Sequence, residues 1–172
     1  MSANAEAEDL KIFRDSARRF FERECMPHVE RWERDGIVDR DLWNKAGAAG
    51  LLCAMIPDQY GGAGGSFAHE KVLIEEMIRA GVTGWGNAVH SGIVAPYLLH
   101  YGSEEQKKKW LPKLASGELV AAIAMTEPGT GSDLQGVKAT AKKSGNGYVL
   151  NGSKTFITNG QHANLIVVVA KT

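Results

Sequence analysis

The chain has 172 residues, with 20 Lys and Arg against 20 Asp and Glu, so its formal net charge is 0. This balance excludes the basic excess that general nucleic-acid binding requires, and we expect no nucleic-acid partner. Hydrophobic residues make up 44% of the chain and charged residues 23%, which excludes a charge-extended disordered protein and indicates a folded core.

The two cysteines, Cys25 and Cys53, are too few for a disulfide scaffold or a zinc ribbon. The five histidines show no ligand spacing with them, so we predict no metal site. The longest apolar run, 165–170, is far shorter than the roughly 18 residues that a membrane span needs. The N-terminus is acidic before it is apolar, unlike a signal peptide, so we expect a cytoplasmic chain without a membrane span.

Up to about residue 116 the apolar spacing is helical. Leu10, Phe13 and Phe20 fall on one face of a helix predicted over 5–25, which Pro27 ends. Further helices are predicted over 41–49, from Ser66 to about Gly81, over 86–100 and, for a short helix that contains Trp110 and Leu114, from Ser103.

Polar residues mark two of these helix starts. Ser66 can cap its helix, and Ser103 begins a capping box in which Gln106 reaches back to the cap. Glu75 and Glu76 lie in the helix that follows Ser66, and adjacent helical residues point in different directions. We interpret this pair as a solvated face beside a core contact, not as an acid–base pair.

After residue 118 the pattern changes to strands and turns. Residues 118–125 form a compact apolar run that predicts a buried strand, and alternation over 137–142 predicts a half-exposed one. Three Asn-Gly pairs are strong hairpin signals, and they separate short strands predicted over 148–150, 153–158 and 164–170.

These elements predict an α+β chain with two unlike parts. An N-terminal all-helical bundle is expected at 1–117, and an incomplete antiparallel β-barrel-like domain at 118–172. The last strand leaves an apolar edge without a partner, so we expect a fragment of a longer protein.

The densest candidate site is 125–133, a strand that runs into a loop with two glycines, three hydroxyls and two acids. Glycines let a ligand approach the backbone, consecutive N–H groups can hold phosphate oxygens, and Thr126, Thr130 and Ser132 add donors. The segment is not a Rossmann fingerprint, because the third glycine is missing, nor a Walker A loop. A polar turn between strands explains its composition equally well.

The second candidate is the segment 154–160. In a strand, Phe156 and Thr158 lie on one face, where an aromatic ring beside a hydroxyl could receive a flat heteroaromatic ring. Ordinary sheet packing explains the same residues, because Phe and Thr are both good strand formers.

Four motifs carry a resemblance to a known family. Residues 124–133, Ala-Met-Thr-Glu-Pro-Gly-Thr-Gly-Ser-Asp, closely resemble the first signature of the acyl-CoA dehydrogenase family. Residues 151–160 match its second signature at the family's spacing, and 101–107 and 57–62 match two further motifs. The resemblance covers nearly the whole chain and is closest to the long-chain branch.

The resemblance implies a cofactor, FAD, and a set of residues that contact it. Thr126 would hydrogen-bond the isoalloxazine ring, and the amides of Gly131 and Ser132 would meet phosphate. Ser132 would also touch acyl-CoA. Phe156 stands where the family has an aromatic residue, often Trp, against the flavin face, and Thr158 would donate to flavin N5. The full implied set is Ile123, Ala124, Met125, Thr126, Gly131, Ser132, Phe156, Ile157 and Thr158.

The resemblance also implies a reaction and partners. The family removes the α-proton and β-hydride of an acyl-CoA thioester and passes electrons to an electron-transfer flavoprotein. Its catalytic glutamate belongs to a C-terminal helical domain that is absent here, so we expect the base beyond Thr172 and no catalytic residue in this chain. Family members are commonly homotetramers.

Two alternatives stay open. One is a non-catalytic fragment that binds flavin or acyl-CoA. The other is a related flavin oxidase or monooxygenase of the same fold, because these relatives share the β-domain motifs.

Overall fold

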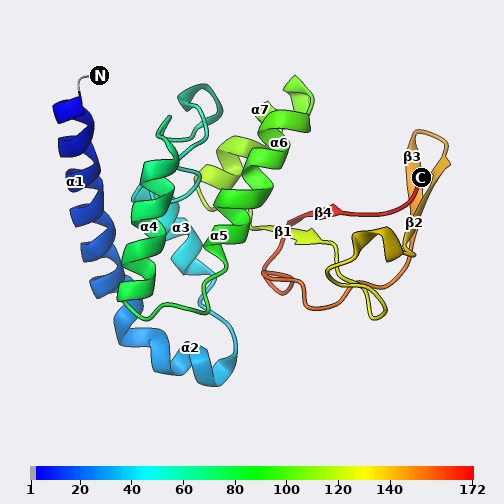
Figure 1. The fold of residues 1–172 in the computed structure, drawn as a ribbon, viewed down its shortest axis with the longest axis horizontal. Helices are drawn as coiled ribbons and strands as arrows, with labels where there is room; N and C mark the ends of the chain where they lie inside the picture. Colours follow the sequence, from blue (N-terminus) through cyan, green and yellow to red (C-terminus); the bar gives the residue numbers. More distant parts are fainter. Residues whose placement is uncertain (1–2) are drawn as a thin grey trace.

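The structure, a computed structural model, describes residues 3–172 and has a helical half followed by a smaller β half (Figure 1). This confirms the predicted α+β class. The helices are α1 (Ala3–Phe20), α2 (Val29–Asp35), α3 (Asp41–Ala48), α4 (Phe67–Arg79), α5 (Asn87–Val89), α6 (Ala95–Tyr101) and α7 (Glu104–Ala115). The strands are β1 (Ala121–Ala124), β2 (Thr140–Ser144), β3 (Gly147–Asn151) and β4 (Leu165–Val168).

Both predicted helix caps are confirmed. The Ser66 hydroxyl accepts a hydrogen bond from the Ala68 amide before α4. Ser103 and Gln106 form a reciprocal capping box before α7, since each side chain accepts from the other residue's amide, at 3.2 and 2.9 Å. These contacts satisfy N–H groups that a helix start leaves unpaired.

The prediction that Pro27 ends the first helical stretch is wrong. After α1 the chain passes through a π-helical turn (Phe21–Cys25) and a 3₁₀ turn (Met26–His28) directly into α2. Pro27 lies at the start of the 3₁₀ turn, where no intrahelical partner for an N–H is needed, so proline is tolerated there.

Aromatic rings fill the centre of the helical half. Trp43 packs edge-on against Trp85 with ring centroids 5.5 Å apart, and Phe21 packs edge-on against Trp85 with centroids 6.0 Å apart. The His90 ring lies 5.0 Å from Trp43 and is fully buried. Such pairs contribute about 0.5–1.5 kcal/mol beyond the area that they bury.

His90 also connects the bundle to the β half. Its Nδ1 accepts from the Ala121 amide at 3.0 Å, which leaves Nε2 to donate to the Leu114 carbonyl at 3.1 Å. Burial lowers the pKa of His90 to about 4, so the ring is neutral at pH 7. One imidazole therefore holds the end of α7 and the start of β1.

The connection between these two elements passes close to α3. Gly117 has a φ of +76°, and a Cβ there would lie 2.1 Å from the Trp43 carbonyl oxygen. Only glycine fits both the backbone conformation and the space.

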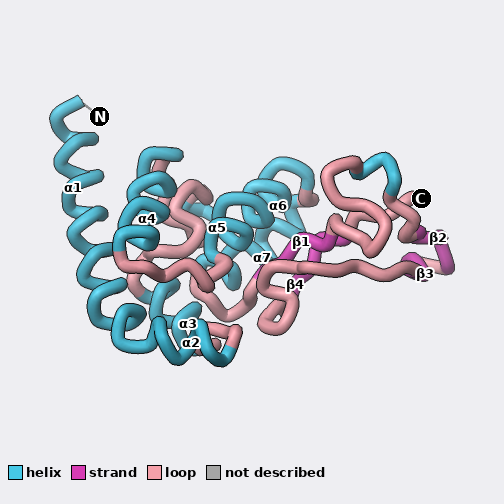
Figure 2. The backbone as a smooth tube through the Cα atoms, turned by 60° about the horizontal axis from the view of Figure 1, so that its bottom comes forward, coloured by secondary structure: helices cyan, strands magenta, loops and turns pink. Residues whose placement is uncertain are grey.

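The strands form two separate pairs (Figure 2). β2 and β3 form the predicted antiparallel hairpin, with Gly145 and Asn146 in the turn. β1 and β4 pair in parallel instead, with Ala121 opposite Leu165, so antiparallel pairing is wrong for these two strands. The long crossover, 125–164, that joins them makes the parallel pairing possible, because a short turn allows only antiparallel pairing.

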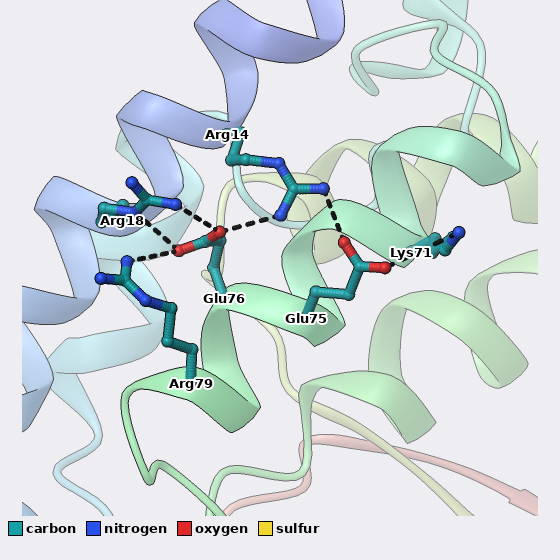
Figure 3. A network of polar contacts seen from close by, with 6 residues as sticks. All are labelled: Arg14, Arg18, Lys71, Glu75, Glu76 and Arg79. Carbon is teal, nitrogen blue, oxygen red and sulfur yellow. Dashed lines mark hydrogen bonds and ion pairs between the residues drawn. The ribbon is translucent and has the colours of Figure 1, made fainter.

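The two adjacent glutamates of α4 have opposite surroundings, as their positions predict (Figure 3). Glu76 is 3% exposed and accepts hydrogen bonds from Arg14, Arg18 and Arg79. Glu75 is 42% exposed and pairs with Arg14 and Lys71. The hydrogen bonds from Arg18, then Arg14 and Arg79, lower the pKa of Glu76 to about 2. This cluster joins α4 to α1.

Both cysteines are buried free thiols. Desolvation raises the pKa of Cys25 and of Cys53 to about 12. The described residues, 3–172, contain no cluster of His, Cys, Asp and Glu that could hold a metal ion. They also contain no helix with the length and apolar character of a membrane span.

Replacing Glu76 by Gln should lower the free energy of unfolding at pH 7 by roughly 2 kcal/mol, because three partly exposed arginines lose the carboxylate that accepts their hydrogen bonds. The low pKa of Glu76 makes its contribution complete above about pH 4.5 and lost as pH falls towards 2. Urea denaturation at pH 7 and pH 3 measures both effects. Glu75→Gln is the control and should cost less than about 1 kcal/mol; equal losses in the two variants would contradict the assignment.

Protonation of buried His90 should lower the free energy of unfolding at a higher pH than protonation of Glu76 does. Its pKa is below the usual 6.5, so neutral His90 stabilises the fold fully above pH 6.5, and this contribution disappears as pH falls towards 4. Over that window wild type should lose up to about 3 kcal/mol more than His90→Gln. Thermal or urea unfolding between pH 7 and 4 measures the difference. Exposed His100, changed to Gln, is the control and should leave the wild-type pH slope in place.

Candidate functional site

The first motif begins in β1, which is buried along its whole length. Ile123 and Ala124 are its last residues, and Met125 and Thr126 follow, half-buried, as the chain leaves the sheet. The apolar character of the strand thus brings the polar loop to the edge of the buried layer.

A tight turn opens that loop. The Glu127 amide donates to the Thr130 carbonyl at 2.9 Å and the Thr130 amide donates back at 3.1 Å, with Pro128 and Gly129 between them. Asp133 then accepts from the Gln135 amide and begins a 3₁₀ turn, Leu134–Gly136.

The Glu127 carboxylate closes the base of the loop. It accepts from the amides of Lys138 and Ala139 at 2.7 and 2.8 Å, and from the Lys154 ammonium at 2.9 Å. The Lys154 ammonium also donates to the Met125 carbonyl. Both charged side chains are well buried, at 6% and 12% exposed. We define Glu127 and Lys154 together as the loop clamp.

The clamp has a definite charge state. The two backbone amides, and after them Lys154, lower the pKa of Glu127 to about 2. A carboxylate held in this way stays ionised at neutral pH and is poorly matched to general-base chemistry there. Glu127 therefore acts as an anchor for the loop. Lys154 is likewise committed to partners within the protein.

The second motif is not a strand. Residues 152–158 are irregular, and Phe156 has φ of +56°, so the predicted strand over 153–158 is wrong. The alternation that placed Phe156 and Thr158 on one face therefore does not apply. The Phe156 ring is 93% exposed, and Thr158 is exposed as well.

The structure brings the two motifs side by side. The Thr155 amide donates to the Thr126 carbonyl at 3.0 Å, and the loop clamp joins the same two segments. The amides of Gly131 and Ser132, both exposed, donate to no partner within residues 3–172. The site therefore presents two free backbone N–H donors, the exposed ring of Phe156, and the hydroxyls of Thr126 and Thr158.

A groove lies where the helical half meets the second motif. Ile37 and Gly84 line it from the helical half, Ile157 and Asn159 from the second motif, and His162 from the turn that follows the motif. Asn159 crosses this boundary with hydrogen bonds to the carbonyls of Gly86 and Ala121.

Sequence reasoning gave no role to the residues that hold this site together. Glu127, Lys154 and Asn159 lie inside the two motifs, but Asn159 counted only as a turn signal. His90, which the sequence showed only to lack metal-ligand spacing with the cysteines, is a buried core residue with both ring nitrogens hydrogen-bonded. The available signal for Glu127 was an acidic residue that comes two positions after the apolar run 118–125, at the start of a glycine-containing loop.

Comparisons with known proteins agree with the two halves. The family model of the acyl-CoA dehydrogenase N-terminal domain matches residues 7–118, and that of the acyl-CoA dehydrogenase middle domain matches residues 122–172. The mitochondrial long-chain specific acyl-CoA dehydrogenase of Sus scrofa is 50% identical over 161 residues, which are 94% of this chain and 37% of that protein.

Solved structures show the same fold. The crystal structure of an acyl-CoA dehydrogenase from Geobacillus kaustophilus has a TM-score of 0.92 at 50% identity and covers 96% of this chain and 43% of its own. A glutaryl-CoA dehydrogenase from Mycobacterium smegmatis in complex with FADH2 has a TM-score of 0.88 at 30% identity, with 94% and 42% covered. This chain spans well under half the length of these relatives. With both of its halves matched by the family's domain models, the chain belongs to the acyl-CoA dehydrogenase family.

Proposed function

We propose that the chain forms the N-terminal helical domain, 1–117, and the first part of the middle domain, 118–172, of an FAD-dependent acyl-CoA dehydrogenase. The enzyme would oxidise a fatty acyl-CoA between its α- and β-carbons and pass the electrons to an electron-transfer flavoprotein. The observation that carries the proposal is the contact between the two motifs, made by Thr126, Thr155 and the loop clamp.

The residues at the site fit FAD. Its pyrophosphate needs N–H donors, and the amides of Gly131 and Ser132 have no partner within residues 3–172. Its isoalloxazine ring needs an apolar face, which the exposed ring of Phe156 can supply. The mycobacterial relative in complex with FADH2 supports the same cofactor.

In this proposal FAD, when bound, supplies the acceptor for the hydride that leaves the β-carbon. The chain's own residues bind and orient it. Ile123, Ala124, Met125 and Ile157 would line the ring, Thr126 would hydrogen-bond it, and Phe156 would pack on its face. Thr158 would donate to N5, where a fixed donor favours the reduced form because that atom gains electron density.

The substrate and assembly belong to the proposal as well. Ser132 would contact bound acyl-CoA. The pig relative supports a long-chain acyl group. We assign the catalytic base to no residue of this chain and expect a homotetramer. The cytoplasmic location expected from the sequence stays a prediction. The pig relative is named as mitochondrial, so it does not support that location.

The proposed function is tested on the complete enzyme to which this chain would belong, loaded with FAD and mixed anaerobically with a saturated long-chain acyl-CoA. Bleaching of the flavin with formation of the 2-enoyl-CoA is the expected result in the holoenzyme. Rapid reoxidation by air with release of hydrogen peroxide would favour an oxidase instead. Retained FAD without bleaching would favour a binding module, and failure to retain FAD after desalting would contradict the proposal.

Ser132→Ala should weaken FAD binding about fivefold, since the site loses one hydroxyl donor worth about 1 kcal/mol. Titration of the protein with FAD, followed by quenching of flavin fluorescence, measures the dissociation constant. Ser144→Ala removes an equally exposed hydroxyl at the end of β2 and is the matched control. An unchanged dissociation constant for Ser132→Ala would make Ser132 an ordinary turn residue.

A further inference from the structure

Asn159 connects three parts of the chain that are far apart in sequence. Its side-chain amide donates to the Gly86 carbonyl at 2.9 Å and to the Ala121 carbonyl at 3.1 Å. Gly86 lies just before α5, and Ala121 is the first residue of β1. Both contacts are part-buried. One side chain thus ties the second motif to the helical half and to the strand that carries the first motif.

The backbone of Asn159 is suited to this task. Its φ is +65°, a left-handed conformation that asparagine adopts more readily than most residues. The amides of His162 and Ala163 donate to its carbonyl at 2.9 and 2.8 Å, so the turn that follows is closed on Asn159. Its backbone and its side chain are therefore both fixed.

Gly86 fits closely against the same residue. A Cβ at Gly86 would lie 2.1 Å from Asn159 Oδ1 and 2.7 Å from Thr158 Cγ2. The φ of Gly86 is −76°, which any residue can adopt, so space and not backbone conformation requires glycine here. The helical half therefore packs directly on Thr158 and Asn159 together.

Thr158 is left with a free hydroxyl. Within residues 3–172 its side chain makes no hydrogen bond, and the residue is exposed. Its position is determined by the peptide that it shares with Asn159 and by the close contact with Gly86. A movement of Asn159 would reach Thr158 through the peptide that the two residues share and through their common contact with Gly86.

We propose that Asn159 is a positioning residue, which fixes Thr158 between Gly86 and Ala121 and so sets the distance of the Thr158 hydroxyl from flavin N5. This inference rests on the proposed function. It implies that the helical half, through Gly86, helps to set the reduction potential of a cofactor bound by the β half.

The test is the two-electron midpoint potential of the FAD-loaded protein, measured by anaerobic titration against a redox dye. Asn159→Asp keeps the shape but turns a carboxylate oxygen towards two carbonyls, and Asn159→Gly keeps the positive φ but removes the amide. Both should shift the potential to more negative values, in the same direction as Thr158→Ala. A tenfold weaker preference for the reduced form corresponds to about 30 mV.

The double variant separates positioning from a general loss of structure. If Asn159 acts through Thr158, Asn159→Asp should cause no further shift in the Thr158→Ala background. Gly86→Ala should shift the potential in the same direction, because its Cβ displaces both residues. Asn146→Asp, in the exposed hairpin turn, is the control and should leave the potential unchanged.

Each outcome decides the inference. An unchanged potential in both Asn159 variants overturns it, as does an equal shift with and without the Thr158 hydroxyl. FAD that binds to all variants with the wild-type dissociation constant, but at an unshifted potential, refutes the inference and leaves the proposed function intact. Failure of the unmodified protein to bind FAD refutes both. If Asn159→Asp is too unstable to load, Asn159→Gly and Gly86→Ala give the same readout.

Discussion

The carboxylate of Glu127 holds three stretches of backbone that are remote from one another in the sequence. It accepts from the amides of Lys138 and Ala139 and is joined by Lys154, whose ammonium reaches the Met125 carbonyl as well. A buried charge is costly unless it is fully hydrogen-bonded. Here the donors are the amides of Lys138 and Ala139, which follow the loop, and the ammonium of Lys154, which belongs to the second motif. The loop, the end of β1 and the second motif are therefore placed by one group. Without that group the polar loop has little apolar surface of its own to order it.

Hydrogen bonds from polar side chains to main-chain groups also attach the β half to the helical half. β1 and β4 bury only a few apolar side chains against the helices, and the hairpin β2–β3 lies at the far end of the molecule (Figures 1 and 2). His90 and Asn159 supply the fixed points, because each bonds to a main-chain group of Ala121. The position of the strand relative to the helices is thus set by two neutral polar side chains. Their directional bonds define an orientation that apolar packing alone does not.

Local chemistry explains which parts of the fold could be predicted. The caps at Ser66 and Ser103 depend on residues three positions apart, so the sequence contains all that is needed to recognise them. The conformation of Phe156, in contrast, does not depend on nearby residues alone. The residues around it have good strand propensity, but contacts from Thr126 and Glu127 on one side and Gly86 on the other hold the segment out of a sheet. Tertiary contacts over about 30 to 70 positions override local preference there. The parallel pairing of β1 with β4 likewise depends on contacts between residues about 44 positions apart, such as the hydrogen bonds between Val120 and Asn164, which local sequence does not show.

The two cysteines add a property of a different kind. Cys25 and Cys53 lie in the core of the helical half, and burial raises the pKa of both thiols to about 12. The thiolate is the reactive form, and both thiols are buried and protonated at neutral pH. A thiol reagent should therefore modify neither residue while the helices stay packed together. Modification then has to wait for the helices to separate, and its rate follows the opening equilibrium. The two thiols thus report local unfolding at two places in the helical half: Cys25 at the end of the π-helical turn after α1, and Cys53 in the loop after α3.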